Sequence, residues 1–213
     1  MVMTQEVFQR FSQLLGERLS KGTGIKEDGV RYSLFASLTE KAPVMLGEIL
    51  FEYEHPNIPR AKIDGYLPSN DKHGAAVWEL KYDRRIPSGH NQPRSNKAGG
   101  LINDVFRLGT FEIGDAIERL LIYLTDEEMK SYLTNPHNGF DVLFGLAPGG
   151  SFRIDSKFLD GRAPSVRDKV HCPLVACDAV ARFTMSLPSV HELRVYEIRR
   201  ATAQPISIDF KVP

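Results

Sequence analysis

The interpretation of this chain starts from two short stretches, Ala61–Leu67 (AKIDGYL) and Ala75–Lys81 (AAVWELK). Both are rich in residues that favour β-strands, and the run Pro68-Ser69-Asn70-Asp71 between them is a turn signal. Side chains alternate between the two faces of a strand, so Glu79 and Lys81 share a face. If the two stretches are neighbouring strands, Asp64 converges on the same spot.

Two carboxylates beside a lysine suit the hydrolysis of a phosphodiester bond. A metal ion polarises the phosphate and lowers the pKa of the attacking water. Mg²⁺ prefers oxygen ligands and usually takes only one or two carboxylates, keeping waters and substrate oxygens for the rest. Asp64 and Glu79 would hold Mg²⁺, with Mn²⁺ as an alternative, and Lys81 would orient or deprotonate the water and offset charge on the phosphate.

The elements around these strands have a recognisable order. Turn residues, apolar spacing and capping residues predict a helix after Thr4 and a second helix over Val30–Leu38. Three strands are predicted next, over residues 47–55, 61–67 and 75–82. A helix over Lys97–Leu108, capped by Ser95 or Asn96, a buried strand that ends at Thr125, and a short helix over Asp126–Leu133 complete the order. The part from residue 47 to residue 125 is therefore three strands, a helix and a strand, with a helix before them.

Here the sequence resembles the PD-(D/E)xK, or restriction-endonuclease-like, nuclease superfamily. The resemblance covers about residues 47–125 and implies an αβββαβ core with a mixed sheet flanked by helices. Its metal-binding acid corresponds to Asp64, and its (D/E)xK motif corresponds to Glu79-Leu80-Lys81. Ile63 stands where the superfamily's name has proline, a variation that the superfamily tolerates. A glutamate, a residue and a lysine alone would be a weak signal, because a solvated strand with alternating charges also produces it.

Some members of the superfamily add an upstream acid. Glu52 and Glu54 share a face of the first expected strand, and either of them could assist. The stretches Glu52–Pro56, Lys81–Arg84, Lys97–Gly100 and Asn103–Leu108 also resemble uncharacterised bacterial proteins of this class. That likeness concerns the fold and says little about the substrate.

A local basic patch follows the proposed catalytic strand. Within seventeen residues the chain has five cationic side chains and one acid, Asp83; the cations are Lys81, Arg84, Arg85, Arg94 and Lys97. The last four are the candidates for contacts to a nucleic-acid backbone. The alternative is an ordinary solvated loop. Because the whole chain carries 27 basic and 27 acidic residues, any attraction of phosphate must come from such a patch.

The chain of 213 residues suits a single α/β (α+β) domain, with a nuclease-like core over residues 1–135. Residues 140–213 are expected to form a β-rich extension packed on that core, with strand-like runs at 141–144, 152–158, 175–186, 192–199 and 206–211. The two cysteines form no disulfide framework, and no apolar run reaches the roughly 18 residues of a membrane helix. We therefore expect a cytoplasmic protein.

The function that this pattern favours is a Mg²⁺-dependent deoxyribonuclease, with a restriction or defence role by analogy and a homodimer as the expected assembly. Two other classes stay open. The same fold without catalysis would be a binding module for nucleic acid or protein. An unrelated mixed α/β protein would keep Asp64 and Glu79 apart. The sequence does not separate DNA from RNA or an endonuclease from an exonuclease.

Overall fold

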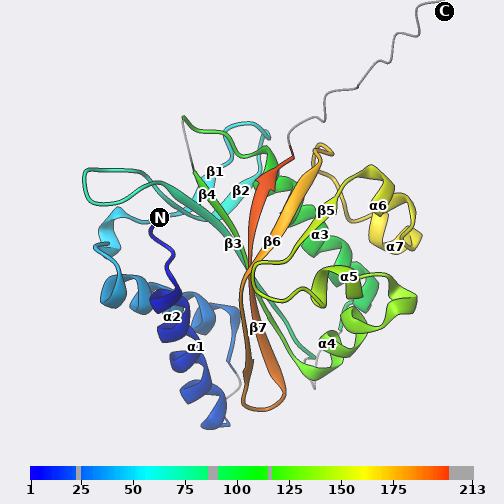
Figure 1. The fold of residues 1–213 in the computed structure, drawn as a ribbon, viewed down its shortest axis with the longest axis horizontal. Helices are drawn as coiled ribbons and strands as arrows, with labels where there is room; N and C mark the ends of the chain where they lie inside the picture. Colours follow the sequence, from blue (N-terminus) through cyan, green and yellow to red (C-terminus); the bar gives the residue numbers. More distant parts are fainter. Residues whose placement is uncertain (23–24, 86–90, 115–116, 202–213) are drawn as a thin grey trace, which may run out of the picture.

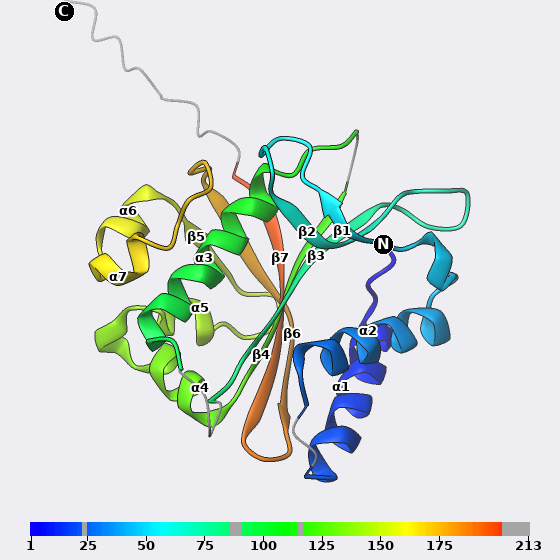
Figure 2. The same ribbon diagram turned by 180° about the vertical axis from the view of Figure 1, so that it is seen from behind.

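The computed structural model describes residues 1–22, 25–85, 91–114 and 117–201. These residues form one mixed, seven-stranded sheet in the order β1-β2-β3-β4-β7-β6-β5. Helices α1 and α2 cover one face of the sheet, and helices α3 to α7 lie on the other face (Figures 1 and 2). Each face has its own hydrophobic core. The expected mixed sheet flanked by helices is confirmed.

The elements run as follows: α1 Gln5–Ser20, α2 Glu27–Lys41, the 3₁₀ turn η1 Leu46–Glu48, β1 Leu50–Glu54, β2 Lys62–Leu67, β3 Ala76–Asp83, α3 Arg94–Thr110, β4 Glu118–Thr125, α4 Glu127–Thr134, η2 Pro136–Asn138, α5 Asp141–Phe144, β5 Ser151–Ile154, α6 Ser156–Asp160, α7 Pro164–Arg167, β6 Cys177–Leu187 and β7 His191–Arg200.

The part from α2 to β4 has the expected order of helix, three strands, helix and strand. Strands β1, β2 and β3 are antiparallel neighbours, whereas β3 and β4 are parallel. Parallel neighbours need a crossover, and α3 supplies it across one face of the sheet. Because of this crossover, one face of α3 packs against the face of β3 that carries Glu79 and Lys81.

Helix α3 begins at Arg94, three residues earlier than predicted, and Ser95 and Asn96 are not its caps. Pro93 is the N-cap, with φ of −53°, and its carbonyl oxygen accepts hydrogen bonds from the backbone of Asn96 and Lys97. The fixed φ of proline therefore prepares the helical turn, and no side-chain cap is needed. By contrast, the predicted cap of α1 is confirmed, since Thr4 accepts a hydrogen bond from Val7 N.

The C-terminal part contains helices as well as strands. Strands β5, β6 and β7 continue the same sheet, and β7 pairs with β4. The prediction of a strand over 141–144 is wrong, because these residues form α5; Phe140, Leu143 and Phe144 repeat at helical spacing and are buried. The run 152–158 is a strand only to Ile154. The expected strand over 206–211 lies outside the described residues.

Within the described ranges, no helix is both long and apolar enough to cross a membrane. Cys172 and Cys177 are both free thiols, as expected. Cys177 is buried, and burial raises the pKa of its thiol to about 12. It therefore belongs to the core rather than to a reactive site.

Candidate functional site

Strand β3 is buried on both faces. Trp78 and Leu80 pack into the core beneath α1 and α2, whereas Val77 packs into the core beneath α3. Glu79 and Lys81 alternate with Trp78 and Leu80, so they face α3 together with Val77. The side chain of Glu79 is only 3% exposed, which makes it a carboxyl group inside the protein rather than on a solvated strand.

Asp64 lies where β2 separates from β3. The ladder between the two strands pairs Leu67, Tyr66 and Gly65 with Ala76, Val77 and Trp78 and stops there. One residue further, the Asp64 carboxylate takes the place of the backbone acceptor, because its Oδ2 accepts a hydrogen bond of 2.7 Å from Leu80 N. The negative charge of Asp64 also contributes to raising the pKa of Glu79. Asp64 is therefore close enough to Glu79 to influence the ionisation of the Glu79 carboxyl group.

Helix α3 adds a stripe of residues that sequence reasoning did not assign to the site. Gly100, Asp104 and Arg107 follow one another at four and three residues and face β3. Lys81 Nζ lies 3.2 Å from Asp104 Oδ2, and Arg107 Nη2 lies 2.8 Å from Asp104 Oδ1. Arg107 Nε lies 2.5 Å from Glu79 Oε1. Asp104 and Arg107 are three residues apart on α3, so their ion pair has ordinary helical spacing, but it lies inside the site.

The ionisation of Glu79 is disfavoured in this environment. Burial raises the pKa of Glu79 well above its ordinary value, the negative charge of Asp104 raises it further, and Arg107 only partly offsets both effects. Although Glu79 Oε1 and Arg107 Nε are close, neither atom makes a hydrogen bond of regular geometry. Glu79 is therefore a buried carboxyl group beside a second acid, with an ion pair to Arg107 that lacks regular hydrogen-bond geometry, and an added cation would be stabilised there.

The raised pKa of Glu79 predicts a pH dependence of stability. A carboxyl whose pKa is higher in the folded state favours folding below its unfolded pKa and loses that contribution as pH rises through the folded pKa. We expect Glu79→Gln to remove this loss, so that the variant gains stability over the wild type as pH rises. Urea unfolding across the pH range, with the exposed Glu54→Gln as control, measures it. Equal pH profiles for all three proteins would mean that Arg107 keeps Glu79 ionised at no cost.

Lys81 stays positively charged. Desolvation lowers the pKa of its ammonium group, but Asp104, Asp83 and Glu27 together outweigh this effect and raise the pKa above its ordinary value. A protonated lysine has no lone pair with which to accept a proton from water. Lys81 is therefore suited to stabilising negative charge rather than to deprotonating a water molecule.

Helix α2 closes the site from the other side. Arg31 Nη2 lies 3.3 Å from Asp64 Oδ1 and 3.7 Å from Glu52 Oε1, so one guanidinium group links both carboxylates. One turn earlier, Glu27 is exposed at the surface; partial desolvation raises the pKa of its carboxyl group, and the negative charge of Asp64 raises it further. Sequence reasoning missed Glu27 and Arg31. The signal available in the sequence was their spacing of four residues, which places them on the same side of a helix.

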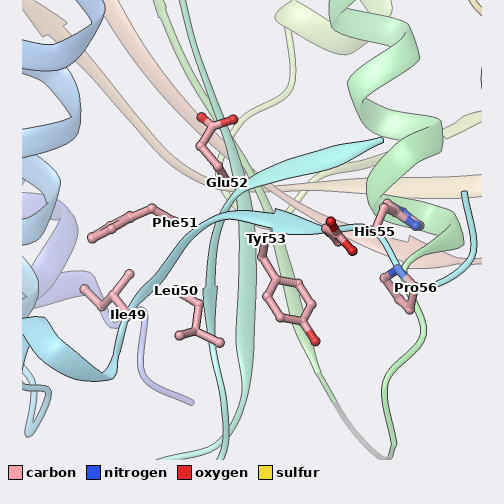
Figure 3. A pocket seen from close by; sticks show the side chains of 8 residues that line it. Ile49, Leu50, Phe51, Glu52, Tyr53, His55 and Pro56 are labelled. Atoms are coloured by element: carbon pink, nitrogen blue, oxygen red, sulfur yellow. The ribbon is translucent and has the colours of Figure 1, made fainter. Parts of the chain in front are cut away.

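The two upstream glutamates have different surroundings. Glu52 has a left-handed backbone with φ of 48° in the middle of β1, between the ladder pairs Phe51–Gly65 and Tyr53–Ile63. Such a conformation costs a non-glycine residue about 1–3 kcal/mol and often marks a functional position. Figure 3 shows Glu52 and Tyr53 projecting in different directions from β1, beside a hollow lined by residues 49–56. Within the described part of the chain, Glu54 has no ion-pair partner.

A cleft of about 590 Å³ opens beside Lys81. It is lined by Lys26, Glu27, Lys81, Tyr82, Asp83, Arg84, Asn91, Gln92, Asn96, Lys97, Gly100, Lys169 and His171. Of the predicted nucleic-acid contacts, Arg84 and Lys97 line this cleft. Arg85 and Arg94 lie in an adjoining hollow with Asp126 and Glu128, and Arg94 Nε is 3.7 Å from Glu128 Oε1.

Asp64 and Glu79 provide the carboxylate oxygens that Mg²⁺ prefers, and in this structure those oxygens lie against the cationic groups of Arg31 and Arg107. A site built by protein side chains alone is a different matter. In residues 1–22, 25–85, 91–114 and 117–201, no three histidine, cysteine, aspartate or glutamate side chains gather as a metal site. The donor set therefore fits Mg²⁺ only when waters or substrate oxygens complete its coordination.

Comparison of the chain with protein-family models, with curated proteins and with solved structures finds no match in any of the three.

Proposed function

We propose that this protein is a metal-dependent phosphodiester hydrolase that acts on DNA, with Asp64, Glu79 and Lys81 as its catalytic centre. The observation that carries the proposal is that the Asp64 carboxylate is hydrogen-bonded to Leu80 N, between Glu79 and Lys81 on the adjacent strand, and that Lys81 lines a cleft with mostly cationic side chains. The αβββαβ order of α2 to β4 agrees with a restriction-endonuclease-like core. A restriction or defence role, in the cytoplasm, follows from that likeness by analogy alone.

Each residue has a chemical task in this proposal. Asp64 and Glu79 would hold Mg²⁺, and the ion would supply Lewis-acid polarisation of the phosphate and an activated water. Lys81, kept protonated by the acids around it, neutralises charge that develops on the phosphate oxygens. Asp104 holds the Lys81 ammonium group in place, and Arg107 provides a positive charge beside Glu79.

The first experiment measures cleavage of plasmid and linear DNA with Mg²⁺, Mn²⁺ or EDTA. We expect cleavage with either metal and none with EDTA. Lys81→Met should lower the rate by about 100-fold, the usual loss for one group that stabilises the transition state. Lys72→Met is the matched control, because Lys72 is exposed in the turn between β2 and β3. Cleavage that persists in EDTA, or a rate that Lys81→Met leaves unchanged, would contradict the proposal.

A second candidate function rests on the Arg107 contact. Arg107 already provides the positive charge next to Glu79, and Asp104 already pairs with Lys81. This arrangement also suits a binding module that has the fold but no metal. Such a protein would bind nucleic acid in its cationic cleft and would show no heat of Mg²⁺ binding by calorimetry, whereas the hydrolase would bind Mg²⁺ in a manner that Asp64→Asn abolishes.

A homodimer is also part of the proposal, by analogy with nucleases of this class that act as symmetric dimers. Light scattering after gel filtration tests it against the 23.9 kDa mass of one chain. A mass of one chain at all concentrations would leave the hydrolase acting on one strand at a time.

A further inference from the structure

The cleft beside Lys81 brings together parts of the chain that are far apart in sequence. Lys26 comes from the start of α2, Lys81 and Arg84 from the end of β3, Lys97 from the first turns of α3, and Lys169 from the segment after α7. Five cationic side chains line it, against two acidic ones, Glu27 and Asp83. Asp83 accepts a hydrogen bond from the hydroxyl group of the buried Tyr123, so one of its carboxylate oxygens already has a partner. The lining therefore favours an anion.

The wall that carries Lys169 is fixed to α3. Gly99 packs so closely against this segment that a Cβ atom there would lie 2.4 Å from the carbonyl oxygen of Val166. Asn103 Oδ1 accepts hydrogen bonds from the backbone of His171 and Cys172 at 2.8 and 3.1 Å. The C-terminal part of the chain thus provides a preorganised wall of the cleft, with Lys169 and His171 exposed on it.

The size of the cleft limits what it encloses. Its volume of about 590 Å³ falls in the range of roughly 300–1,000 Å³ typical of sites that surround a small molecule. This is room for a nucleotide-sized segment, whereas a duplex would have to lie across the outside of the protein. Tyr82 and the amide side chains of Asn96 and Gln92 also line it. Cations for the backbone, with aromatic and amide groups for bases, are the usual equipment for an unpaired strand.

We propose that this cleft binds an unpaired nucleic-acid strand, with Lys26 and Lys169 contacting its phosphates on opposite walls and Lys81 beside the phosphate that reacts. This inference rests on the proposed function for the role of Lys81, and it narrows the substrate class from DNA in general to a single-stranded end or loop. It also assigns a task to the segment after α7, which forms the second wall.

Binding is measured in EDTA, where no metal-dependent cleavage occurs. The probes are a fluorescent single-stranded DNA of about 12 nucleotides, the same sequence as RNA, and the matching duplex, since single-strand sites span about 4–16 nucleotides. We expect the wild type to bind a single strand at least about tenfold more tightly than the duplex at equal salt. The tighter of the DNA and RNA probes identifies the sugar that the cleft accepts.

The variant that tests the cleft is Lys26→Ala with Lys169→Ala. The alanine keeps the Cβ of residue 169 that lies against Gly99, and the Lys26 side chain does not cap α2, so the fold should persist. Losing two phosphate contacts should weaken single-strand binding at least about tenfold and reduce the slope of log affinity against log salt by about 1.4. Lys157→Ala, an exposed lysine on α6, is the control.

Equal or tighter binding of the duplex would overturn the inference, as would a double variant that binds like Lys157→Ala. These outcomes are separate from the fate of the hydrolase. If the wild type binds single strands through Lys26 and Lys169 but cleaves nothing with Mg²⁺, the cleft is established and the proposed catalysis fails. If it cleaves duplex DNA through Asp64 while the double variant binds normally, the catalysis is established and the cleft assignment fails.

Discussion

Replacing Asp64 by asparagine is expected to abolish metal-dependent cleavage, with a loss of at least about 1,000-fold, or about 4 kcal/mol of transition-state stabilisation. Asparagine keeps an oxygen that can accept the hydrogen bond from Leu80 N, so the junction of β2 and β3 should survive. What disappears is the negative charge that the metal ion needs. The substitution therefore removes the charge of residue 64 while it keeps the shape of the side chain.

The measurement is the single-turnover cleavage rate at saturating Mg²⁺, together with the Mg²⁺ affinity by calorimetry. Asp71→Asn is the matched control, because Asp71 is an exposed aspartate in the turn after β2. We expect the control to cleave at the wild-type rate and both variants to unfold near the wild-type temperature. A folded Asp64→Asn protein that retains a tenth of the wild-type rate would remove Asp64 from the catalytic centre.

The order of elements up to β4 could be predicted because its signals are local. Prolines and polar turns separate three short runs with β-favouring residues, and the apolar stripe of α3 has a helical period. The face that Glu79 and Lys81 share follows from strand alternation alone. The strand predicted at 141–144 failed for the opposite reason, since four residues are too few to separate a strand from one helical turn.

The partners of the catalytic residues could not be predicted in the same way. Asp104 and Arg107 have the spacing of an ordinary ion pair on a helix surface, and only the crossover of α3 turns that surface toward β3. A residual signal exists, because Asp104 lies three residues after Leu101 and four before Leu108, both buried. An acid on the apolar side of a helix is buried and needs a hydrogen-bond or ion-pair partner, but the sequence does not identify that partner.

The wall of the cleft that follows α7 could not be predicted, because it depends on contacts between residues far apart in the sequence. Asn103 contacts residues 68 and 69 positions later, and no local pattern connects them. The two glycines of α3 depend on such contacts as well. Gly99 lies against the segment from Val166 to Lys169, and Gly100 lies near the Lys81 side chain. Long-range contacts of this kind depend on the whole topology.

Gly65→Ala is expected to destabilise the protein strongly, because the added methyl group would clash with a side chain of the core. A Cβ atom at this position would lie 2.2 Å from two ring atoms of Trp78, far inside van der Waals contact. Trp78 is fully buried beneath α1 and α2, so its ring has no free space to move into. Overpacking of this severity costs about 3 kcal/mol of unfolding free energy, the upper part of the usual range. For a chain of this size, that lowers the melting temperature by about 6–12 °C.

Gly74→Ala is the control for Gly65→Ala, because a Cβ atom at residue 74 meets no atom within 4 Å and the residue has no positive φ. It should be neutral or stabilise by up to about 1 kcal/mol through the unfolded chain. The pair of thermal unfolding curves separates a packing clash from a general effect of removing glycine. A Gly65→Ala protein as stable as the wild type would mean that the Trp78 ring can move to another position. In that case the Trp78 ring would not be the reason why residue 65, next to Asp64, is a glycine.

The cause can be isolated further by shrinking the ring. Trp78→Leu alone should destabilise the protein by creating a cavity, by about 3 kcal/mol or more. In the double variant, the alanine methyl at residue 65 occupies part of that cavity, so the two losses should not add. We expect the double variant to be more stable than the sum of the single effects by about 1–3 kcal/mol. Additive losses would show that the methyl group meets the backbone of β3 rather than the indole, and that Gly65 is required by the strand pairing that positions Asp64.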